Sequence, residues 1–318
     1  MTQPKKNNIH SKTQFGNAHK ITVAVWRDRW LYIILVPTIV YFFLFKYIPM
    51  GGIIMAFQDF NMFKGIKGSE FVGFKVFEKI FNDTHFWKTI RNTLFLNLTS
   101  LIVSFPLTII LALALNEIKA DKFKKFSQSL LYLPHFVSWV VVAGIATNLF
   151  NMTTGTINGL IKGLGFAAVP FLSDNAWWVF TYVVVNIWKN IGWGTIIYLG
   201  ALAGVDESLY EAAYLDGATK FQRIIYVTLP SIKNVMVTML ILEISKMMSI
   251  GLDAPLLLGN DKVMGISDVI STYVYRLGIL SASYSEATAI GLFQSVVNII
   301  ILVIADRFAK LIGEEGIL

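Results

Sequence analysis

Residues 206 to 230 read Asp206-Glu-Ser-Leu-Tyr-Glu-Ala-Ala-Tyr-Leu-Asp-Gly-Ala-Thr-Lys-Phe-Gln-Arg-Ile-Ile-Tyr-Val-Thr-Leu-Pro230, a polar stretch between two long apolar ones. The patterns Ser208-x-x-Glu211 and Thr219-x-x-Gln222 are capping boxes, and each predicts the start of a helix. Gly217 lies between them, where a helix end often needs a positive φ. We therefore expect two short amphipathic helices around a glycine, docked on another surface.

The chain around this loop is too apolar for an ordinary soluble protein. Its 318 residues are 55% hydrophobic and 15% charged, and the mean hydropathy is +0.61. Globular domains usually carry about 25% charged residues, so much of this surface is expected to face lipid. In such a chain the net charge of +7 indicates first cytoplasmic loop charge and only second a nucleic-acid interface.

Several kinds of chemistry are excluded by the composition. The absence of cysteine excludes disulfides, thiolate zinc sites and iron–sulfur clusters. The four histidines never form a His-x-x-x-His or His-Glu-x-x-His pair, so no metal site is predicted. No Gly-Lys-Ser/Thr occurs, so the chain has no P-loop with which to hydrolyse a nucleotide itself.

Six stretches are predicted to cross the membrane as helices, because about 20 apolar residues span the hydrocarbon core. They cover residues 31–49, 92–116, 130–150, 178–202, 231–252 and 287–305. The fifth holds Lys233, Glu243 and Lys246 and is expected to be shielded inside the bundle. The sequence therefore predicts an all-α integral membrane protein. Its parts are a basic tail over 1–29, a six-span domain over 30–312 that contains a cytoplasmic loop over 204–230, and a C-terminal tail over 313–318.

The orientation follows from the lysines and arginines in the loops. An even number of spans puts both termini on one side, and a cytoplasmic N-terminus gives 14 basic residues inside and nine outside. We therefore expect both termini in the cytoplasm. The first outer loop opposes this orientation, because six of the nine outer basic residues lie in it: Lys64, Lys67, Lys75, Lys79, Lys88 and Arg91.

The loop between the fourth and fifth spans resembles the EAA loop of ATP-binding-cassette importer permeases. That pattern is Glu-Ala-Ala, three residues, Gly, nine residues, and Ile-x-Leu-Pro. This chain matches it at Glu211, Ala212, Ala213, Gly217, Leu229 and Pro230, and has Val227 where the family usually has Ile. The runs Arg27-Asp-Arg-Trp-Leu-Tyr, Phe45-Lys-Tyr-Ile-Pro-Met and Asp268-Val-Ile-Ser-Thr-Tyr-Val-Tyr-Arg276 are similar to the branch that imports oligosaccharides or polysaccharide fragments, the LplB-type permeases.

The resemblance implies a subunit of a type I importer in the bacterial cytoplasmic membrane. Its partners would be a second homologous permease, two ATPase subunits and an extracellular or periplasmic solute-binding protein that delivers a carbohydrate. ATP and Mg would be bound by the ATPases, and this chain would carry no cofactor and no enzymatic activity. The six matching residues of the EAA loop would couple ATP hydrolysis to alternating access of the permease.

Polar and aromatic residues inside the predicted spans are candidates for the substrate pathway. Indole faces stack on the C–H faces of sugars, and amides pair with their hydroxyls. The candidates are Trp139, Asn148, Trp188, Lys189, Asn190, Trp193 and Glu243. We expect Glu243 to pair with Lys246 three residues on, with Lys189 reaching both. Tryptophans of the interfacial belt and a static ion pair that holds the bundle are the alternative explanations.

Other interpretations stay open at this point. Glu211 is also explained as a capping-box carboxylate, and Pro230 as the first-turn proline of the fifth span. The Lys119 to Lys125 cluster is expected to contact anionic membrane lipid. Two other functions fit the sequence: a permease of the same superfamily for a non-sugar solute, and an intramembrane enzyme that uses Glu243.

Overall fold

The computed structural model describes residues 27, 29–311, 313, 314, 316 and 317, and it is almost entirely helical. Two compact units divide the chain, residues 1–54 and residues 55–318. Apart from Arg27 and Arg29, the predicted basic tail lies outside the described residues.

The described part of the first unit belongs to one apolar helical segment. It begins with α2 (Arg29–Phe42), passes through a wider turn, η1 (Phe43–Tyr47), and continues as α3 (Ile48–Met50). The tighter helix η2 (Gly51–Phe57) follows directly. This continuous segment is 29 residues long and is apolar enough to cross a membrane.

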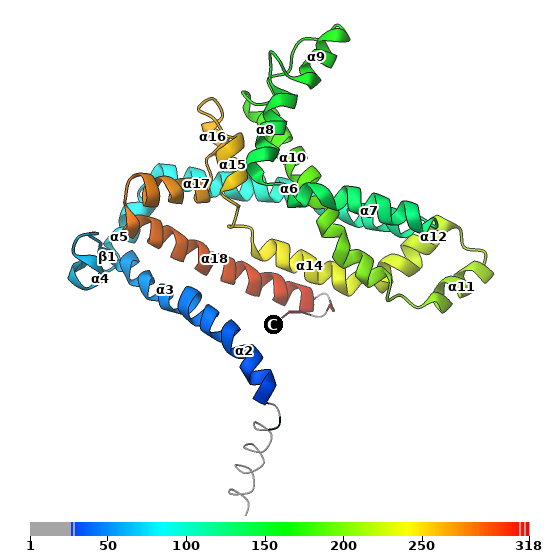
Figure 1. Ribbon diagram of the computed structural model, residues 1–318, viewed down its shortest axis with the longest axis horizontal. Helices are drawn as coiled ribbons and strands as arrows, with labels where there is room; N and C mark the ends of the chain where they lie inside the picture. The colour runs from blue at the N-terminus through cyan, green and yellow to red at the C-terminus, as the bar shows by residue number, and fades with distance from the viewer. Residues whose placement is uncertain (1–26, 28, 312, 315, 318) are drawn as a thin grey trace, which may run out of the picture. The chain divides into compact units, whose positions relative to one another are not determined.

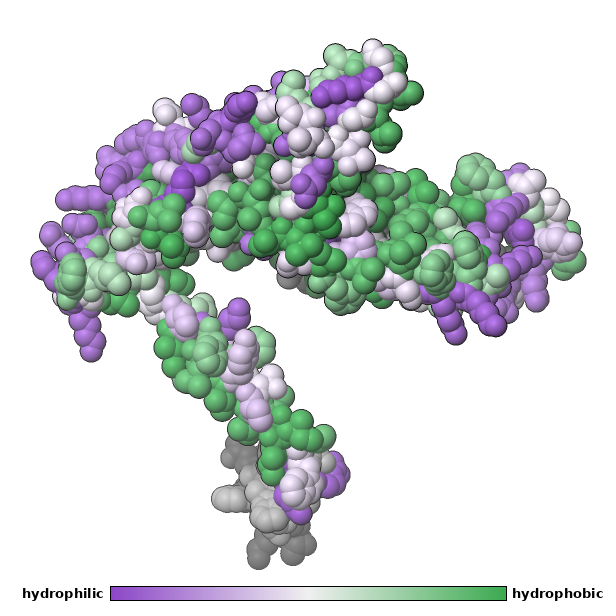
Figure 2. All heavy atoms as spheres, turned by 45° about the horizontal axis from the view of Figure 1, so that its top comes forward, coloured by the Kyte–Doolittle hydropathy of each residue, from purple (hydrophilic) through white to green (hydrophobic). Residues whose placement is uncertain are grey.

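Long helices form the body of the second unit (Figure 1). They are α6 (Thr84–Asn116), α10 (Asn175–Leu202), α14 (Lys233–Ser245) and α18 (Tyr284–Leu311). Helix α6 packs on α10, and α14 packs on α18. Their buried cores include Phe86, Leu96 and Trp178, whose side chains are almost fully enclosed. Much apolar surface stays exposed, and Figure 2 shows it between two hydrophilic ends.

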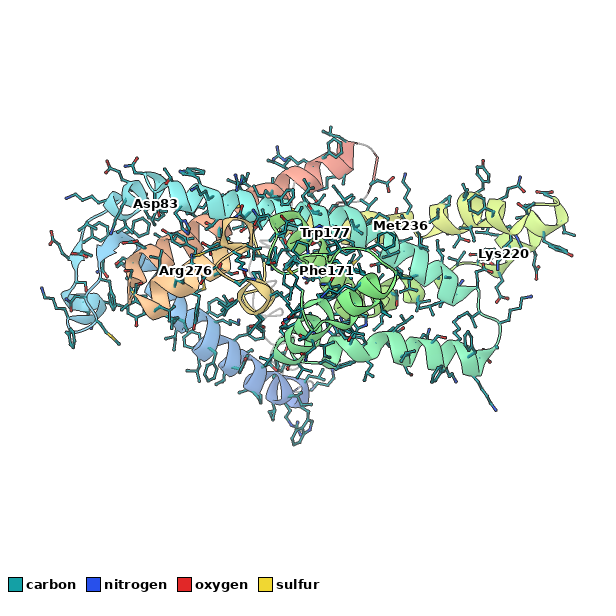
Figure 3. All side chains as sticks on the ribbon, turned by 90° about the horizontal axis from the view of Figure 1, so that it is seen from above. Asp83, Phe171, Trp177, Lys220, Met236 and Arg276 are labelled. Atoms are coloured by element: carbon teal, nitrogen blue, oxygen red, sulfur yellow. The ribbon has the colours of Figure 1, made fainter. Side chains whose placement is uncertain are left out.

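Short elements occupy the two ends of this unit. At one end lie α4 (Gly65–Gly68), α5 (Lys75–Phe81) and the antiparallel pair β1 (Gln58–Asp59) and β2 (Glu70–Phe71). At the opposite end lie α11 (Glu207–Leu215) and α12 (Lys220–Arg223), which η3 (Ile224–Thr228) and α13 (Leu229–Ser231) join to α14 (Figure 1). Figure 3 likewise shows Lys220 far from Asp83 and Arg276.

The third predicted span, residues 130–150, is not one unbroken helix. Helix α7 (Asp121–Phe136) and helix α8 (Trp139–Phe150) meet at a bend of 100°. Val137 is extended, and Ser138 caps α8 by accepting the backbone N–H of Val141. Apolar composition alone did not reveal this new helix start. Helix α9 (Thr156–Gly163) follows α8.

The predicted fifth span is interrupted. Helix α14 ends at Ser245, and residues 246–252 are not helical before α15 (Asp253–Leu258) begins. The chain then forms α16 (Met264–Ser267), α17 (Ile270–Tyr275) and the wider turn η4 (Arg276–Leu280) before α18.

In the described part of the chain, three helices are long and apolar enough to cross a membrane, and two bent pairs raise the number to five. Helix α10 is long enough too, but Asn186, Lys189 and Asn190 make its middle more polar. The count of six spans therefore stays a prediction.

Candidate functional site

Residues 206–230, hereafter the coupling loop, begin with helix α11. Asp206 is its N-cap, and the carboxylate accepts the backbone N–H of Ser208 at 2.9 Å. This hydrogen bond holds the pKa of the Asp206 carboxyl below its usual value. The predicted capping box between Ser208 and Glu211 is therefore wrong, because Asp206 starts the helix earlier. Glu211 lies exposed on α11.

The turn between α11 and α12 agrees with the sequence prediction. Gly217 has φ +77°, and the N–H of Ala218 reaches back to the carbonyl of Ala213 at 2.9 Å. The predicted capping box of α12 is confirmed. The N–H of Thr219 donates to Oε1 of Gln222 at 2.8 Å, and Oγ1 of Thr219 accepts the N–H of Gln222 at 3.4 Å.

Two side-chain contacts hold the coupling loop in place, one within the loop and one to a neighbouring segment. The hydroxyl of Tyr210 lies 3.0 Å from Oγ1 of the buried Thr228. Nζ of Lys220 lies 2.8 Å from Oε2 of Glu117, the C-cap residue of α6. Large apolar side chains remain exposed on the loop, among them Leu215 at 84% and Tyr226 at 75%. An exposed apolar surface of this kind is typical of a protein–protein interface.

A cavity of about 400 Å³ lies among α6, α10 and α14. Helix α6 contributes Asn97, Ser100, Ser104 and Thr108, whose spacing of three and four residues puts them on one face. Helix α10 contributes a second row with a strict spacing of four, in which every member except the glycine has a polar side chain: Tyr182, Asn186, Asn190, Gly194 and Tyr198. Two polar faces therefore meet inside an otherwise apolar bundle.

The non-helical residues 246–252 form part of the wall of this cavity. Nδ2 of Asn97 donates to the carbonyls of Met247 at 2.9 Å and Ser249 at 3.1 Å. Two side chains of α18 bond the backbone of Met248. Nε2 of Gln294 donates to the Met248 carbonyl at 2.5 Å, and Oδ1 of Asn298 accepts the Met248 N–H at 3.1 Å. Side-chain amides thus replace the missing helical bonds, an arrangement that membrane proteins use where irregular backbone lines a cavity.

Among the predicted pathway residues, Asn190 and Glu243 line this cavity. Glu243 and Lys246 form the expected pair, with Oε1 and Nζ 3.9 Å apart. Lys189 does not reach them. Its ammonium instead donates to the carbonyls of Pro134, His135 and Val137 at the end of α7.

The other candidates lie outside the cavity. Trp139 lies under the ammonium of Lys189, with Nζ 5.5 Å from its ring centroid. Trp188 lines an apolar depression of about 310 Å³ between α8 and α10. Trp193 stacks on His135 with ring centroids 4.6 Å apart, and Asn148 is exposed on α8. None of these three tryptophans lines the cavity, so their place on a sugar pathway stays a prediction.

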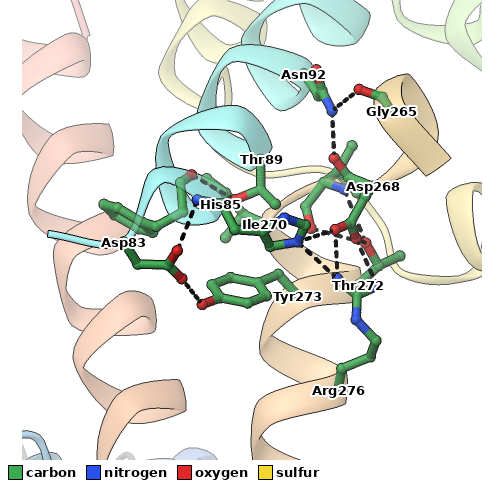
Figure 4. Close-up of polar contacts among 12 residues, drawn as sticks. Asp83, His85, Thr89, Asn92, Gly265, Asp268, Ile270, Thr272, Tyr273 and Arg276 are labelled. Atoms are coloured by element: carbon green, nitrogen blue, oxygen red, sulfur yellow. Dashed lines mark hydrogen bonds and ion pairs between the residues drawn. The ribbon is translucent and has the colours of Figure 1, made fainter. Parts of the chain in front are cut away.

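A polar clamp joins the start of α6 to the segment from α16 to η4 (Figure 4). At its centre is the Asp268 carboxylate, whose side chain is 2% exposed. It accepts hydrogen bonds from both Nη atoms of Arg276 (2.8 and 2.5 Å) and from Oγ1 of Thr272 (2.6 Å), and it lies 2.7 Å from Nε2 of His85. Burial raises the pKa of Asp268, but the bonds from Arg276, Thr272 and His85 outweigh burial and hold that pKa below its usual value.

Two further bonds complete the polar clamp. Nδ2 of Asn92 donates to the backbone carbonyl of Asp268 at 2.8 Å, and the Tyr273 hydroxyl donates to Asp83 at 2.5 Å. Asp83 is also the N-cap of α6. The described part of the chain contains no group of three or more His, Cys, Asp or Glu side chains that could hold a metal ion.

Comparison with known proteins identifies the kind of molecule to which this fold belongs. Residues 87–314 match the family described as binding-protein-dependent transport system inner membrane component. The chain belongs to this family. It is therefore a multi-pass inner membrane component and a transporter subunit rather than an enzyme, as the EAA resemblance implied.

Individual relatives are similar over nearly the whole chain. Protein LplB of Bacillus subtilis is 42% identical over 316 residues, which cover 99% of each chain. The polygalacturonan/rhamnogalacturonan transport system permease protein YteP of the same organism is also 42% identical, over 94% of this chain and 93% of its own. A chain of a bacterial alginate ABC transporter, crystallised with an alginate pentasaccharide-bound periplasmic protein, superposes with a TM-score of 0.83 at 37% identity. The superposition covers 92% of this chain and 98% of that one.

Proposed function

We propose that this chain conducts oligosaccharide or polysaccharide fragments through the cavity among α6, α10 and α14. The observation that carries the proposal is the pair of polar rows that face each other there, one on α6 and one on α10. Hydroxyl and amide groups can both donate and accept, as sugar hydroxyls require. The volume of about 400 Å³ lies in the usual range for small-molecule sites.

A carbohydrate is favoured over other solutes for two reasons. YteP is named for polygalacturonan and rhamnogalacturonan transport, and the similar alginate transporter was crystallised with a pentasaccharide-bound partner. The cavity walls of this chain are also mostly uncharged, and Glu243, which lines them, lies beside Lys246. An amino acid or a metal chelate would call for more fixed charges at the site.

The coupling loop is proposed to receive the movement of an ATPase subunit. Glu211 and the exposed apolar side chains of α11 and α12 would form the contact, while Ala212, Ala213, Gly217, Leu229 and Pro230 shape the loop. ATP and Mg would be bound by two ATPase subunits. When these close, the loop would move and the cavity would change the side to which it opens.

The remaining partners follow from the same proposal. A second homologous permease would supply the other half of the pathway, and an extracellular or periplasmic binding protein would deliver the sugar. The loop charges favour an orientation with both termini in the cytoplasm, which places the coupling loop beside the ATPases and the polar clamp outside.

Reconstitution tests this function directly. The complex of this permease with its partner subunits should hydrolyse ATP faster when its binding protein carries an oligosaccharide. This chain alone, free of contaminating ATPase, should hydrolyse none. Stimulation by a loaded amino-acid or chelate binding protein and by no sugar would contradict the carbohydrate assignment. A chemical reaction catalysed by the isolated chain would favour an intramembrane enzyme instead.

A further inference from the structure

Lys189 is a buried cation in the middle of α10 that the cavity does not use. Its side chain reaches the last turn of α7, where Nζ donates to the carbonyls of Val137 at 2.5 Å, His135 at 2.8 Å and Pro134 at 3.3 Å. Lys189 as a whole is only 6% exposed. The last carbonyls of a helix lack the usual intrahelical partners. At the end of α7 the N–H of Val137 bonds only the carbonyl of Pro134, and Lys189 supplies donors to the carbonyls of His135 and Val137 as well. It thereby fixes the 100° bend between α7 and α8.

Two further contacts join the same parts of α7 and α10. At Gly192, a Cβ atom would lie 2.0 Å from the carbonyl oxygen of Leu131, so the two backbones pack directly on each other. Nδ1 of His135 lies 3.2 Å from Oδ1 of Asn190, and the His135 ring stacks on Trp193. The end of α7 is therefore held along one full turn of α10.

This junction lies between the two functional regions. Asn190, next to Lys189 in the chain, lines the cavity. The other end of α7 follows Glu117 by a short turn, and Glu117 contacts Lys220 of the coupling loop. Helix α7 thus extends from the coupling loop to the cavity wall, and Lys189 determines how firmly it is attached there.

We infer that Lys189 is a positioning residue that makes α7 and the cavity-lining part of α10 move as one body during transport. The inference rests on the proposed function, because it assigns to this lysine the transfer of movement between coupling loop and cavity. An anchor that only stabilised the fold would affect assembly and nothing else. A positioning residue must also change how strongly a sugar at the cavity stimulates ATP hydrolysis in the complex.

The first test compares variants in the reconstituted complex. Lys189→Met fills the same volume without donors, and it should lower the sugar-stimulated part of ATP hydrolysis about tenfold while basal hydrolysis and subunit assembly persist. Lys189→Arg keeps the donors and should retain most of the stimulation. Lys67→Met, at an exposed lysine of α4, is the matched control and should behave as wild type. Wild-type stimulation in Lys189→Met would overturn the inference.

The second test needs no sugar and therefore separates this inference from the proposed function. Because the chain has no cysteine, Ser129→Cys on α7 and Ile197→Cys on α10 can carry spin labels in a complex whose other subunits are cysteine-free. Their distance should be narrow and equal with and without trapped ATP, and Lys189→Met should broaden or shift it. If Lys189→Met does not assemble, Lys189→Gln, which keeps a donor on a shorter side chain, takes its place. An unchanged narrow distance in the assembled variant overturns the inference, even if no sugar stimulates the wild-type complex.

Discussion

The hydroxyl of Tyr210 lies 3.0 Å from Oγ1 of Thr228, so a side chain of α11 is bonded to the turn that leads into Leu229 and Pro230. Thr228 is buried, and its hydroxyl also lies 3.3 Å from the carbonyl of Arg223. The first helix of the coupling loop and the start of the next membrane segment are therefore connected directly. A force applied to α11 reaches η3 without passing through α12.

Tyr210→Phe removes this connection and little else. Because a neutral hydrogen bond contributes about 0.5 to 1.5 kcal/mol, we expect a small loss in thermal stability of the complex. Sugar-stimulated ATP hydrolysis should fall more than basal hydrolysis, since α11 would move with less effect on η3. Tyr226→Phe, at a side chain 75% exposed, is the control. Equal stimulation in Tyr210→Phe and wild type would show that the contact is dispensable for coupling.

Glu211 provides a second test, because its carboxylate does not cap α11. Glu211→Gln and Glu211→Ala should both leave the helix folded and should both weaken sugar-stimulated ATP hydrolysis, since each removes the charge offered to an ATPase. Asp206→Ala is the contrasting variant and should reduce the helicity of α11, because Asp206 bonds the N–H of Ser208. If Glu211→Gln transports as wild type does, the loop couples through shape and apolar packing alone.

Two substitutions two residues apart on α10 can distinguish the role of the cavity from that of its surroundings. Asn186→Leu replaces an amide in the polar row with an apolar side chain of similar size. The loss of one hydrogen bond to the sugar should raise the KM for uptake about five- to tenfold. Trp188→Ala lies on the apolar depression and should leave that KM unchanged. The reverse pattern, measured as uptake into proteoliposomes, would support the indole lining that the sequence suggested.

Gly192→Ala should disrupt the contact between α10 and α7. The added Cβ would meet backbone atoms of Leu131 at 2.0 and 2.5 Å, which side-chain motion cannot relieve. Overpacking of this kind costs about 1 to 3 kcal/mol, so the melting temperature of the purified complex should fall. Gly200→Ala on the same helix is the control, because nothing lies within 4 Å of its added Cβ. A melting temperature equal to that of Gly200→Ala would show that the helices separate easily.

The polar clamp predicts how stability depends on pH. The pKa of Asp268 is lower in the folded chain than in the unfolded chain, so its contribution is complete above the unfolded value of about 3.9. That contribution is lost as the pH falls through the lower, folded pKa. The melting temperature should therefore be insensitive to this group between pH 7 and pH 5 and should fall below about pH 4. Asp83 adds in the same direction, because the bonds from Tyr273 and His85 outweigh its burial and lower its pKa.

Asp268→Asn should remove most of the fall in melting temperature that occurs below about pH 4. It leaves Arg276 without its counter-ion and should cost about 3 kcal/mol at pH 7, the low end for a broken buried pair, because about a third of the Arg276 side chain is exposed. Asp261→Asn, at an exposed position in the same loop region, should change neither the stability at pH 7 nor the loss of stability in acid. A variant of Asp268 that melts as wild type does at pH 7 would show that the clamp contributes no stability.

Local features were predictable from the sequence, and contacts between distant segments were not. The turn at Gly217 and the capping box from Thr219 to Gln222 depend only on neighbouring residues. The sequence pattern was therefore sufficient to predict both. The capping box predicted at Ser208 was wrong because Asp206, two residues earlier, is the N-cap of α11. Lys189 was misassigned for another reason: its acceptors lie more than 50 residues away, and no periodicity reveals backbone carbonyls at a helix end.

The cavity itself left a signal that the sequence interpretation missed. Tyr182, Asn186, Asn190 and Tyr198 recur at multiples of four within one apolar stretch, which is the spacing of a single helix face. The sequence interpretation selected tryptophans as sugar-stacking groups and did not examine the spacing of the polar residues. The break after Ser245 was harder to foresee, because the amides that replace its helical bonds come from α6 and α18.

Helix α6 is 33 residues long, about 13 more than a helix needs to cross the hydrocarbon core. The polar clamp engages its first turns, at the end opposite the coupling loop, so His85 lies in the part of the helix that extends beyond the hydrocarbon core. In the proposed orientation His85, whose side chain is 40% exposed, faces the growth medium and not the cytosol, and the buried Asp268 lies directly behind it. An acid or saline habitat would therefore act on this end of the permease while the cell keeps the ATPase end at constant composition.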